Sequence, residues 1–351
     1  MIITFLIGNG FDISLAEKYK SFFVNTTTYR AMYDWNSKYE YSTIEQKNNR
    51  LTSSLYNRHS NNLWSDFESG LVSSFLNLKN PETDIVNFFR DKDQLCNYIN
   101  DYLRLFFQER INETNYTNEC LSEFQTSVLL FQERMQEEDK RILFDFVDGL
   151  DLNEIYIDFI NFNGTNTLEH LINELKKSPV EIAIGNEKYN AKIRNVYYVH
   201  SKLEGKTGHY HEYAFGTTQR KIFEGARLLN AMNSNNNLPS SIINALDKTN
   251  YDFKTWISNT SIFVTHGLSF GETDEFYWVE IAKRLHSNSI LIDFPFANSE
   301  EKGSTQLLND KKDSRRNQLL RGEKDEWENK VIICINAAFK NTEDSSSIFS
   351  F

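Results

Sequence analysis

The first twelve residues, which read MIITFLIGNGFD, constrain the fold more than any other stretch of the sequence. The run from Ile2 to Ile7 is almost entirely apolar and stops at a glycine, which is typical of a central strand covered on both faces. Gly8 and Gly10 then allow a tight turn in which backbone N–H groups can approach a phosphate, and Asp12 is placed to cap a following helix. A strand, a glycine turn and a helix in this order predict a nucleotide-binding α/β sheet.

Five further apolar runs predict the other strands of this sheet. They cover residues 155–160, 196–199, 261–264, 290–294 and 331–335. Clusters of Gly, Asn, His or Ser follow four of the runs at their carboxyl ends, which is the edge where open α/β sheets bind ligands. The sequence therefore predicts a mostly parallel, Rossmann-like sheet with one shared site along that edge.

The segment 31–149 has a different character from the sequence on either side. Apolar side chains such as Phe124 and Val128 recur there at three- and four-residue intervals, and no alternating strand pattern occurs. We predict that this segment is a large helical insertion after the first strand and helix. Residues 1–30 and 150–351 would then form one Rossmann-like nucleotide-binding domain.

Composition narrows the class of protein. The formal net charge of −11 opposes nucleic acid over most of the surface, so we expect no general nucleic-acid binding. Cys96, Cys120 and Cys334 are an odd number without pair spacing, which indicates a reducing compartment. The sequence has neither a basic leader nor an apolar run of membrane-spanning length, and we therefore expect a cytoplasmic protein that binds no membrane.

Two other chemistries find only partial support. Residues 267–271 match the GxSxG nucleophile elbow, but the only histidine after Ser269 is His286, and it precedes the acid Asp293, which is the wrong order for an α/β-hydrolase. A metal site would need several histidines to lie close together. No HExxH motif or paired-acid spacing supports such a site, so we predict no metal. The candidate metal ligands are His200, His209, His211 and His266.

A nucleotide site uses the polar clusters together. A diphosphate over Gly8 and Gly10 would place a ribose near Asn163 and His200. Breaking a ribosyl bond passes through an oxocarbenium-like state, which needs a group that orients the ribose or water and a general base near neutral pH. Asn163 suits the first role and His200 the second. The alternatives are that Asn163 caps the next helix and that His200 is an ordinary hydrogen-bonded histidine.

Five short motifs are spread over most of the chain. They read IGNGFD, YKSF, FINFNGTNTLE, YYVH followed by AFG, and GLSFGETD. In this order they resemble the AbiH family of bacteriophage abortive infection proteins. The resemblance implies a cytoplasmic defence effector that arrests an infected cell.

The same motifs are similar, more distantly, to the sirtuin-like NAD hydrolases of antiphage defence. This similarity implies a sirtuin-like fold, NAD as the substrate or ligand, and catalytic roles for Asn163 and His200. It also implies nucleotide binding by a set of turn residues: Gly8, Asn9, Gly10, Phe11, Asp12, Gly267, Ser269 and Asp274. The sequence departs from the sirtuin-like pattern at Gly164, Thr165 and Ser201.

We therefore predict an antiphage effector that binds an adenine dinucleotide and hydrolyses NAD at the nicotinamide–ribose bond. One alternative is a non-catalytic nucleotide sensor in a defence complex. The other is a nuclease-type effector that targets nucleic acid with a metal held by the histidine loop. An effector that arrests its own cell must be inactive before infection. We therefore expect its activity to be controlled by a phage-derived trigger, a defence partner protein or homo-oligomerisation.

Overall fold

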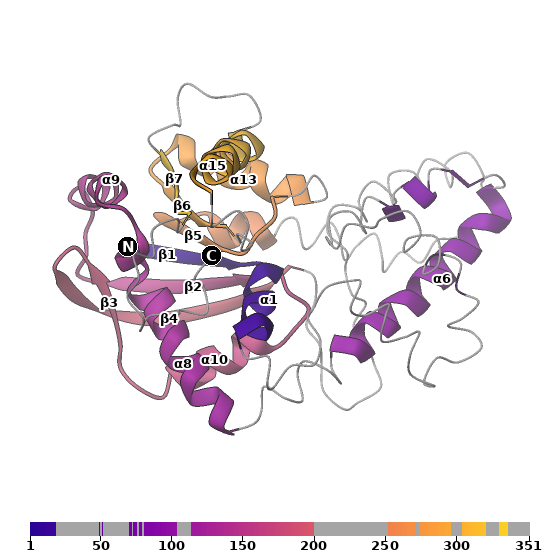
Figure 1. Ribbon diagram of the computed structural model, residues 1–351, viewed down its shortest axis with the longest axis horizontal. Helices are drawn as coiled ribbons and strands as arrows, with labels where there is room; N and C mark the ends of the chain where they lie inside the picture. Colours follow the sequence, from indigo (N-terminus) through magenta and orange to yellow (C-terminus); the bar gives the residue numbers. More distant parts are fainter. Residues whose placement is uncertain are drawn as a thin grey trace.

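The computed structural model describes residues 1–18, 49, 51, 70–71, 73–75, 77–78, 81–103, 114–199, 252–270, 274–295, 304–320 and 330–335. Within these ranges the chain forms a seven-stranded, mostly parallel sheet with helices packed against it (Figure 1). The predicted α/β architecture with a mostly parallel sheet is confirmed, whereas the Rossmann-like fold stays a prediction.

The strand order of the sheet is β3-β4-β2-β1-β5-β6-β7. These strands are β1 (Ile2–Ile7), β2 (Ile155–Asn161), β3 (Val180–Ile184), β4 (Glu187–Tyr198), β5 (Ile262–His266), β6 (Ile290–Phe294) and β7 (Val331–Ile333). Among them only β3 is antiparallel to its neighbour. The chain adds β2 and β4 on one side of β1 and then returns to add β5, β6 and β7 on the other. The direction of strand addition therefore reverses between β1 and β5.

Strand β3 and the beginning of β4 were not predicted from the sequence. These two strands form a hairpin around Gly185, whose φ of 65° favours glycine. The predicted run 196–199 covers only the end of β4. The beginning of β4 is largely exposed and carries polar side chains, so it lacks the apolar run that marks a strand buried on both faces.

Helices connect most of the strands and pack on the sheet. They are α1 (Asn9–Lys18), α6 (Pro81–Tyr102), α8 (Thr114–Leu129), the 3-10 helix η2 (Phe131–Arg134), α9 (Glu137–Val147), α10 (Thr167–Leu175), α13 (Glu275–His286) and α15 (Thr305–Leu320). Contacts join α8 to α10 and β3, and α15 to α13 and β7. Figure 1 shows these two groups at opposite ends of the sheet.

The core is centred on β1, which has strands on both sides. The Phe5 ring stacks on Phe159 of β2 at a centroid distance of 5.4 Å and meets the edge of Phe131 at 6.1 Å. Phe124 of α8 packs against the Phe159 ring at 6.1 Å and against Phe11 of α1 at 6.2 Å. The last part of the segment 31–149 thus contributes α8 and η2 to the core of the sheet. The exact domain boundaries stay a prediction.

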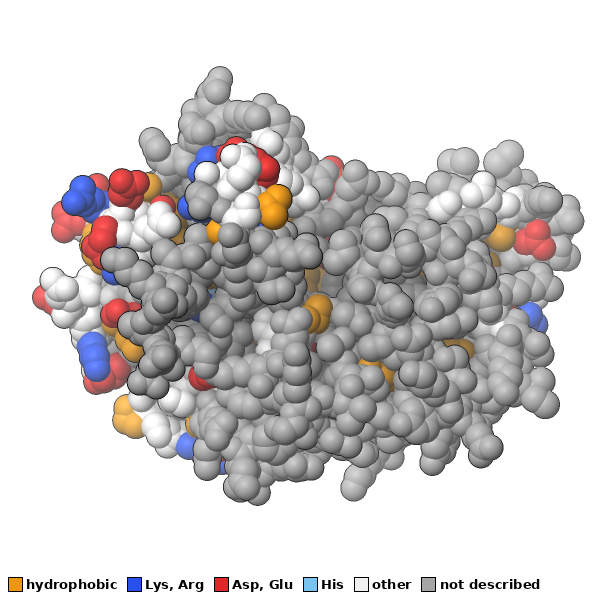
Figure 2. All heavy atoms as spheres, in the orientation of Figure 1, with side chains coloured by type: hydrophobic (Ala, Val, Ile, Leu, Met, Phe, Trp, Pro, Cys, Tyr) orange, Lys and Arg blue, Asp and Glu red, His pale blue; other side chains and the backbone are white. Residues whose placement is uncertain are grey.

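No helix in the described part of the chain combines the length and apolar character needed to cross a membrane. On the face shown in Figure 2, acidic and basic side chains are intermixed over α9 and α15. This mixture differs from the single-sign basic surface that marks nucleic-acid binding.

Candidate functional site at the carboxyl edge of the sheet

The carboxyl ends of three central strands lie side by side at one edge of the sheet. Ile7, at the end of β1, is aligned with Asn161 at the end of β2 and with His266 at the end of β5. The segments that follow these three strands carry the predicted glycine turn, Asn163 and the 267–270 turn. The parallel register therefore brings stretches that are far apart in the sequence to the same edge.

The glycine turn and the 267–270 turn touch through their backbones. The Gly8 N–H donates to the His266 carbonyl at 2.8 Å, and the Gly10 N–H donates to the Gly267 carbonyl at 3.0 Å. A Cβ atom on Gly8 would lie 2.5 Å from the Gly267 carbonyl oxygen, and one on Gly10 would lie 2.7 Å from the Gly267 Cα. Glycine at these positions is therefore required for the close approach of two chain segments.

This contact changes what the glycine turn can offer a phosphate. The N–H groups of Gly8 and Gly10 are bonded to the neighbouring turn, and the Phe11 N–H donates to the Gly8 carbonyl at 3.0 Å. A diphosphate at this edge would have to displace these hydrogen bonds or be held by other groups.

Asp12 does not cap the first helix, so this part of the sequence analysis was wrong. Helix α1 begins at Asn9, one residue after the end of β1, because the Gly8 carbonyl already accepts a hydrogen bond from the Phe11 N–H in the first turn. Asp12 lies inside the first turn and is fully buried. Its Oδ2 accepts a 2.5 Å hydrogen bond from the Thr165 hydroxyl. Burial raises the pKa of Asp12 to about 7, against the lowering effect of the hydrogen bonds from Thr165 and Thr167.

Asn163 lies in the loop that follows β2, next to Thr165. Its backbone N–H donates to the Asn161 side-chain oxygen at 2.9 Å, and the Asn161 amide donates to the Thr165 carbonyl at 3.3 Å. Asn163 is only 3% exposed, and neither polar atom of its side-chain amide has a hydrogen-bond partner in the described part of the chain. The N-cap position of α10 is held by Asn166, so the alternative role of Asn163 as a helix cap is wrong.

The late glycine motif forms a tight turn at the same edge. Gly267 has a φ of 63°, and Leu268 and Phe270 are buried while Ser269 is exposed. Asp274 occupies the N-cap position of α13 without a capping hydrogen bond from its side chain. Gly267 and Leu268 therefore lie beside the glycine turn, and the nucleotide-binding roles predicted for Gly267, Ser269 and Asp274 stay predictions.

His200, the predicted base, lies outside the described residues. Val199, which precedes it, donates its N–H to the Asn161 carbonyl at 2.9 Å. The described chain thus reaches residue 199 beside the end of β2.

His266 is part of the core. Its ring stacks between Phe5 at 6.2 Å and Phe294 at 5.0 Å, and it is fully buried. Burial, with a smaller contribution from the positive charge of Arg134, holds the pKa of His266 well below its usual range. The candidate ligands His209 and His211 lie outside the described residues, and the residues described contain no cluster of His, Cys, Asp and Glu that could hold a metal ion.

Comparison with known protein families gives a match over most of the chain. The family model described as bacteriophage abortive infection AbiH matches residues 4–296. The chain belongs to the AbiH family. The match includes Asp12, Asn163 and the 267–270 turn, and AbiH membership implies a role in antiphage abortive infection. Comparison with curated proteins gives no match.

Two residues that organise the candidate site of this AbiH family member were not identified from the sequence. Thr165 joins the loop after β2 to Asp12, and Arg315 of α15 binds Asp293 and the 267–270 turn. Thr165 follows Asn163 by two positions, which is a usable signal once Asn163 is suspected. Arg315 lies in a charged segment that reads as a solvated helix, and only the three-dimensional structure identifies it. Because Arg315 binds both oxygens of Asp293, that acid is not arranged to orient a histidine.

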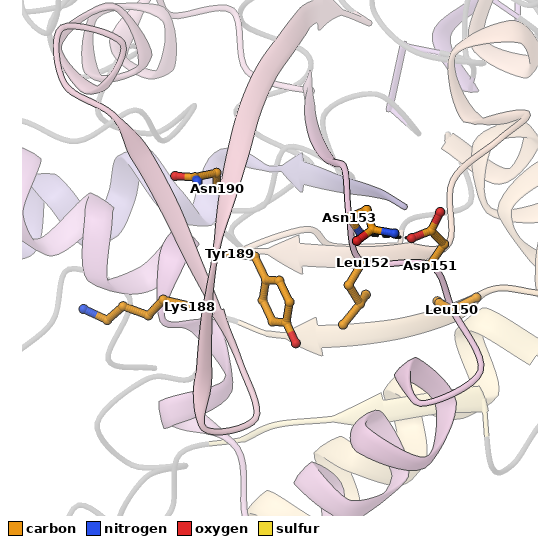
Figure 3. A pocket seen from close by; sticks show the side chains of 7 residues that line it. All are labelled: Leu150, Asp151, Leu152, Asn153, Lys188, Tyr189 and Asn190. Atoms are coloured by element: carbon orange, nitrogen blue, oxygen red, sulfur yellow. Dashed lines mark hydrogen bonds between the residues drawn. The ribbon is translucent and has the colours of Figure 1, made fainter.

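A separate pocket lies at the opposite edge of the sheet (Figure 3). It has a volume of about 520 Å³ and opens between the residues before β2 and the start of β4. Figure 3 shows Asp151 and Asn153 on one side and Lys188 and Tyr189 on the other. Because β2 and β4 begin at this edge, the pocket is remote from the glycine turn and contributes nothing to the candidate site.

Proposed function

We propose that this AbiH family member is a defence effector that binds an adenine dinucleotide at the carboxyl edge of its sheet. We further propose that it hydrolyses NAD at the bond between nicotinamide and ribose. Family membership implies the defence role, and the following observations support the chemistry.

The topology supports a nucleotide site of the Rossmann-like kind. When the parallel strands are numbered along the chain and the antiparallel β3 is left out, their spatial order becomes 3-2-1-4-5-6. Open sheets with this order bind dinucleotides in the crevice where the strand order reverses. In this chain the reversal lies between β1 and β5, where the glycine turn and the 267–270 turn meet.

The observation that carries the proposal is the buried side-chain amide of Asn163. A buried amide without hydrogen bonds costs free energy, on the order of 1–3 kcal/mol, and is retained where a ligand or a mechanism requires it. The Oδ1 atom of Asp12, joined to the same loop through Thr165, is also buried and has no hydrogen-bond partner among the residues that the structure describes. Ribose hydroxyls both donate and accept hydrogen bonds, so a ribose matches an amide and a carboxyl group placed together.

The proposed reaction is a hydrolytic displacement. Water attacks C1′ of the ribose, the bond from C1′ to the nicotinamide nitrogen breaks, and the pyridinium nitrogen keeps the bonding electrons and leaves as neutral nicotinamide. Asn163 orients the ribose or the water, and His200 takes the proton from the water. Gly267, Ser269 and Asp274 close the second half of the site.

A non-catalytic nucleotide sensor is the second candidate. The buried polar atoms of Asn163 and Asp12 that have no partner in the described residues favour it, because hydrogen bonds from them could hold a ribose without any catalytic step. A sensor would bind the nucleotide at the same residues and pass the signal to a partner protein.

The test is incubation of the purified full-length protein with NAD, alone and with lysate from phage-infected cells, followed by chromatography of nicotinamide and ADP-ribose. We expect the wild type to release both products and Asn163→Ala or His200→Ala to lower turnover by about 100-fold or more. Asn153→Ala, an exposed asparagine at the opposite edge, is the matched control and should keep full activity.

The three functions give different results in this experiment. Saturable binding of NAD without products would support the sensor. Absence of both binding and turnover would overturn the nucleotide proposal. Loss of RNA or DNA that a chelator prevents, with NAD unchanged, would support a nuclease.

A further inference from the structure

The 267–270 turn has an unusual backbone conformation. Phe270 has a φ of 50°, in the left-handed region that residues other than glycine rarely adopt. Such residues persist only when their surroundings fix them, and they cluster at binding sites and ligand clamps. The exposed Ser269 lies between the buried Leu268 and Phe270. The position of Ser269 therefore depends on what holds its two neighbours.

Arg315 of α15 holds both of them. Its Nη1 donates a 2.7 Å hydrogen bond to the Leu268 carbonyl, and its guanidinium carbon lies 4.0 Å from the centre of the Phe270 ring. The same guanidinium donates to both oxygens of Asp293, from Nε at 2.8 Å and from Nη2 at 2.7 Å. Arg315 is 6% exposed and Asp293 is fully buried. A planar guanidinium can make all these contacts at once, whereas an ammonium group cannot.

The turn that Arg315 holds is the one that touches the glycine turn. The Gly267 carbonyl accepts the Gly10 N–H, and a Cβ atom on Gly8 would lie 2.7 Å from the Leu268 Cα. The Thr265 hydroxyl also donates to Asp293, which ties the end of β5 to the end of β6. A shift of the 267–270 turn would therefore displace Ser269 and the glycine turn together.

We propose that Arg315 is a positioning residue, which holds Ser269 and the glycine turn in the geometry that the nucleotide site needs. It acts through the Leu268 carbonyl, the Phe270 ring and Asp293. Because these turns belong to the proposed nucleotide site, this role rests on the function proposed above. Helix α15 lies beyond residue 296, where the AbiH match ends, so the family match gives no indication of it.

The test combines two double variants of the full-length protein. Arg315→Met with Asp293→Asn removes both charges of the buried pair, so that no unpaired carboxylate stays in the core. Arg194→Met with Asp158→Asn is the matched control, because it removes the arginine–aspartate pair between β4 and β2 on the other side of β1. Hydrogen exchange is measured by mass spectrometry on peptides that span residues 5–12, 158–164 and 266–270.

We expect the first double variant to exchange at least tenfold faster in peptides 5–12 and 266–270 and to leave peptide 158–164 unchanged. The control should leave peptides 5–12 and 266–270 as in the wild type. The half-saturation concentration for ADP-ribose should rise at least tenfold in the first variant and by less in Arg315→Lys, which keeps the charge.

Equal acceleration in all three peptides would show a general loss of stability and would overturn the proposal, as would unchanged exchange in peptide 5–12. If the first double variant does not fold, Arg315→Lys is compared with the wild type in the same way. If the wild type binds no ADP-ribose, the proposed function fails, while hydrogen exchange still decides whether Arg315 holds the turn.

Discussion

The hydroxyl of Thr165 donates a 2.5 Å hydrogen bond to the carboxyl group of Asp12, and both side chains are buried. This bond joins the first turn of α1 to the loop after β2. It places the Asn163 loop beside the glycine turn, although more than a hundred residues separate the two segments in the sequence.

The buried carboxyl group of Asp12 predicts a specific pH dependence of stability. The pKa of Asp12 is raised from 3.8 to about 7 in the folded protein. The unfolded chain releases this proton near pH 4 and the folded protein near pH 7, so the free energy of unfolding falls as the pH rises between these values. Ionised Asp12 therefore destabilises the protein at pH 8 by roughly 4 kcal/mol.

Asp12→Asn should remove this loss, because an amide does not ionise and can still accept the Thr165 hydrogen bond. We expect the variant to be more stable than the wild type at pH 8 and similar to it at pH 4, as measured by urea unfolding across this range. Asp145→Asn, on the exposed face of α9, is the control and should follow the wild type. Parallel pH profiles for Asp12→Asn and the wild type would contradict the assigned pKa.

His266 predicts a pH dependence of the opposite sign. Because its pKa is held well below 6.5 in the folded protein, the unfolded chain takes up a proton first as the pH falls, and stability is lost below about pH 6.5. Replacing His266 with Leu in the Asp12→Asn background should flatten this part of the profile. His286→Leu, at the exposed end of α13, should leave the acid side of the profile unchanged. An acid limb that His266→Leu does not alter would exclude this histidine as its source.

The glycine contacts predict different costs for the same substitution at two positions. Gly267 and Gly185 both have positive φ values, 63° and 65°. A Cβ atom at Gly185 meets nothing within 4 Å, whereas one at Gly267 would lie 2.7 Å from the Gly10 backbone. Gly185→Ala should therefore cost about 1–2 kcal/mol from backbone strain alone. Gly267→Ala should cost roughly 1–3 kcal/mol more from overpacking, and equal costs in thermal unfolding would refute the close contact.

The Asn163 amide predicts a conflict between stability and function. Because its polar atoms have no partners in the described chain, Asn163→Ala removes an unsatisfied buried group and should leave the free energy of unfolding unchanged or slightly raised. Thr165→Val breaks the bond to Asp12 and should lower stability by about 1–3 kcal/mol. Urea unfolding of both variants checks this. A large loss of stability in Asn163→Ala would mean that the amide has a structural role.

The central strand and its neighbours could be predicted from sequence because strands buried on both faces are continuous apolar runs. The residues from Ile2 to Ile7 and from Ile290 to Phe294 show this pattern, and both form strands. The hairpin of β3 and β4 could not be predicted in the same way, since the exposed face of β4 breaks the apolar pattern.

The sequence predicted which segments meet at one edge of the sheet, because parallel strands align their carboxyl ends and bring the glycine and asparagine clusters together. The partners of each residue depend on side chains from distant elements, such as Thr165 for Asp12 and Arg315 for the 267–270 turn. The prediction that Asp12 caps the first helix was wrong, because α1 begins three residues earlier, at Asn9. The Gly8 carbonyl, not a side chain, accepts the hydrogen bond of its first turn.

The most direct test is to measure the NAD content of cells that express this protein. Mass spectrometry would record NAD at successive times during a phage infection. We predict that NAD falls after infection in cells with the wild type and stays constant in cells with Asn163→Ala, which should also lose protection. Protection by the wild type at constant NAD, with protection lost in Asn163→Ala, would keep the site and contradict NAD hydrolysis.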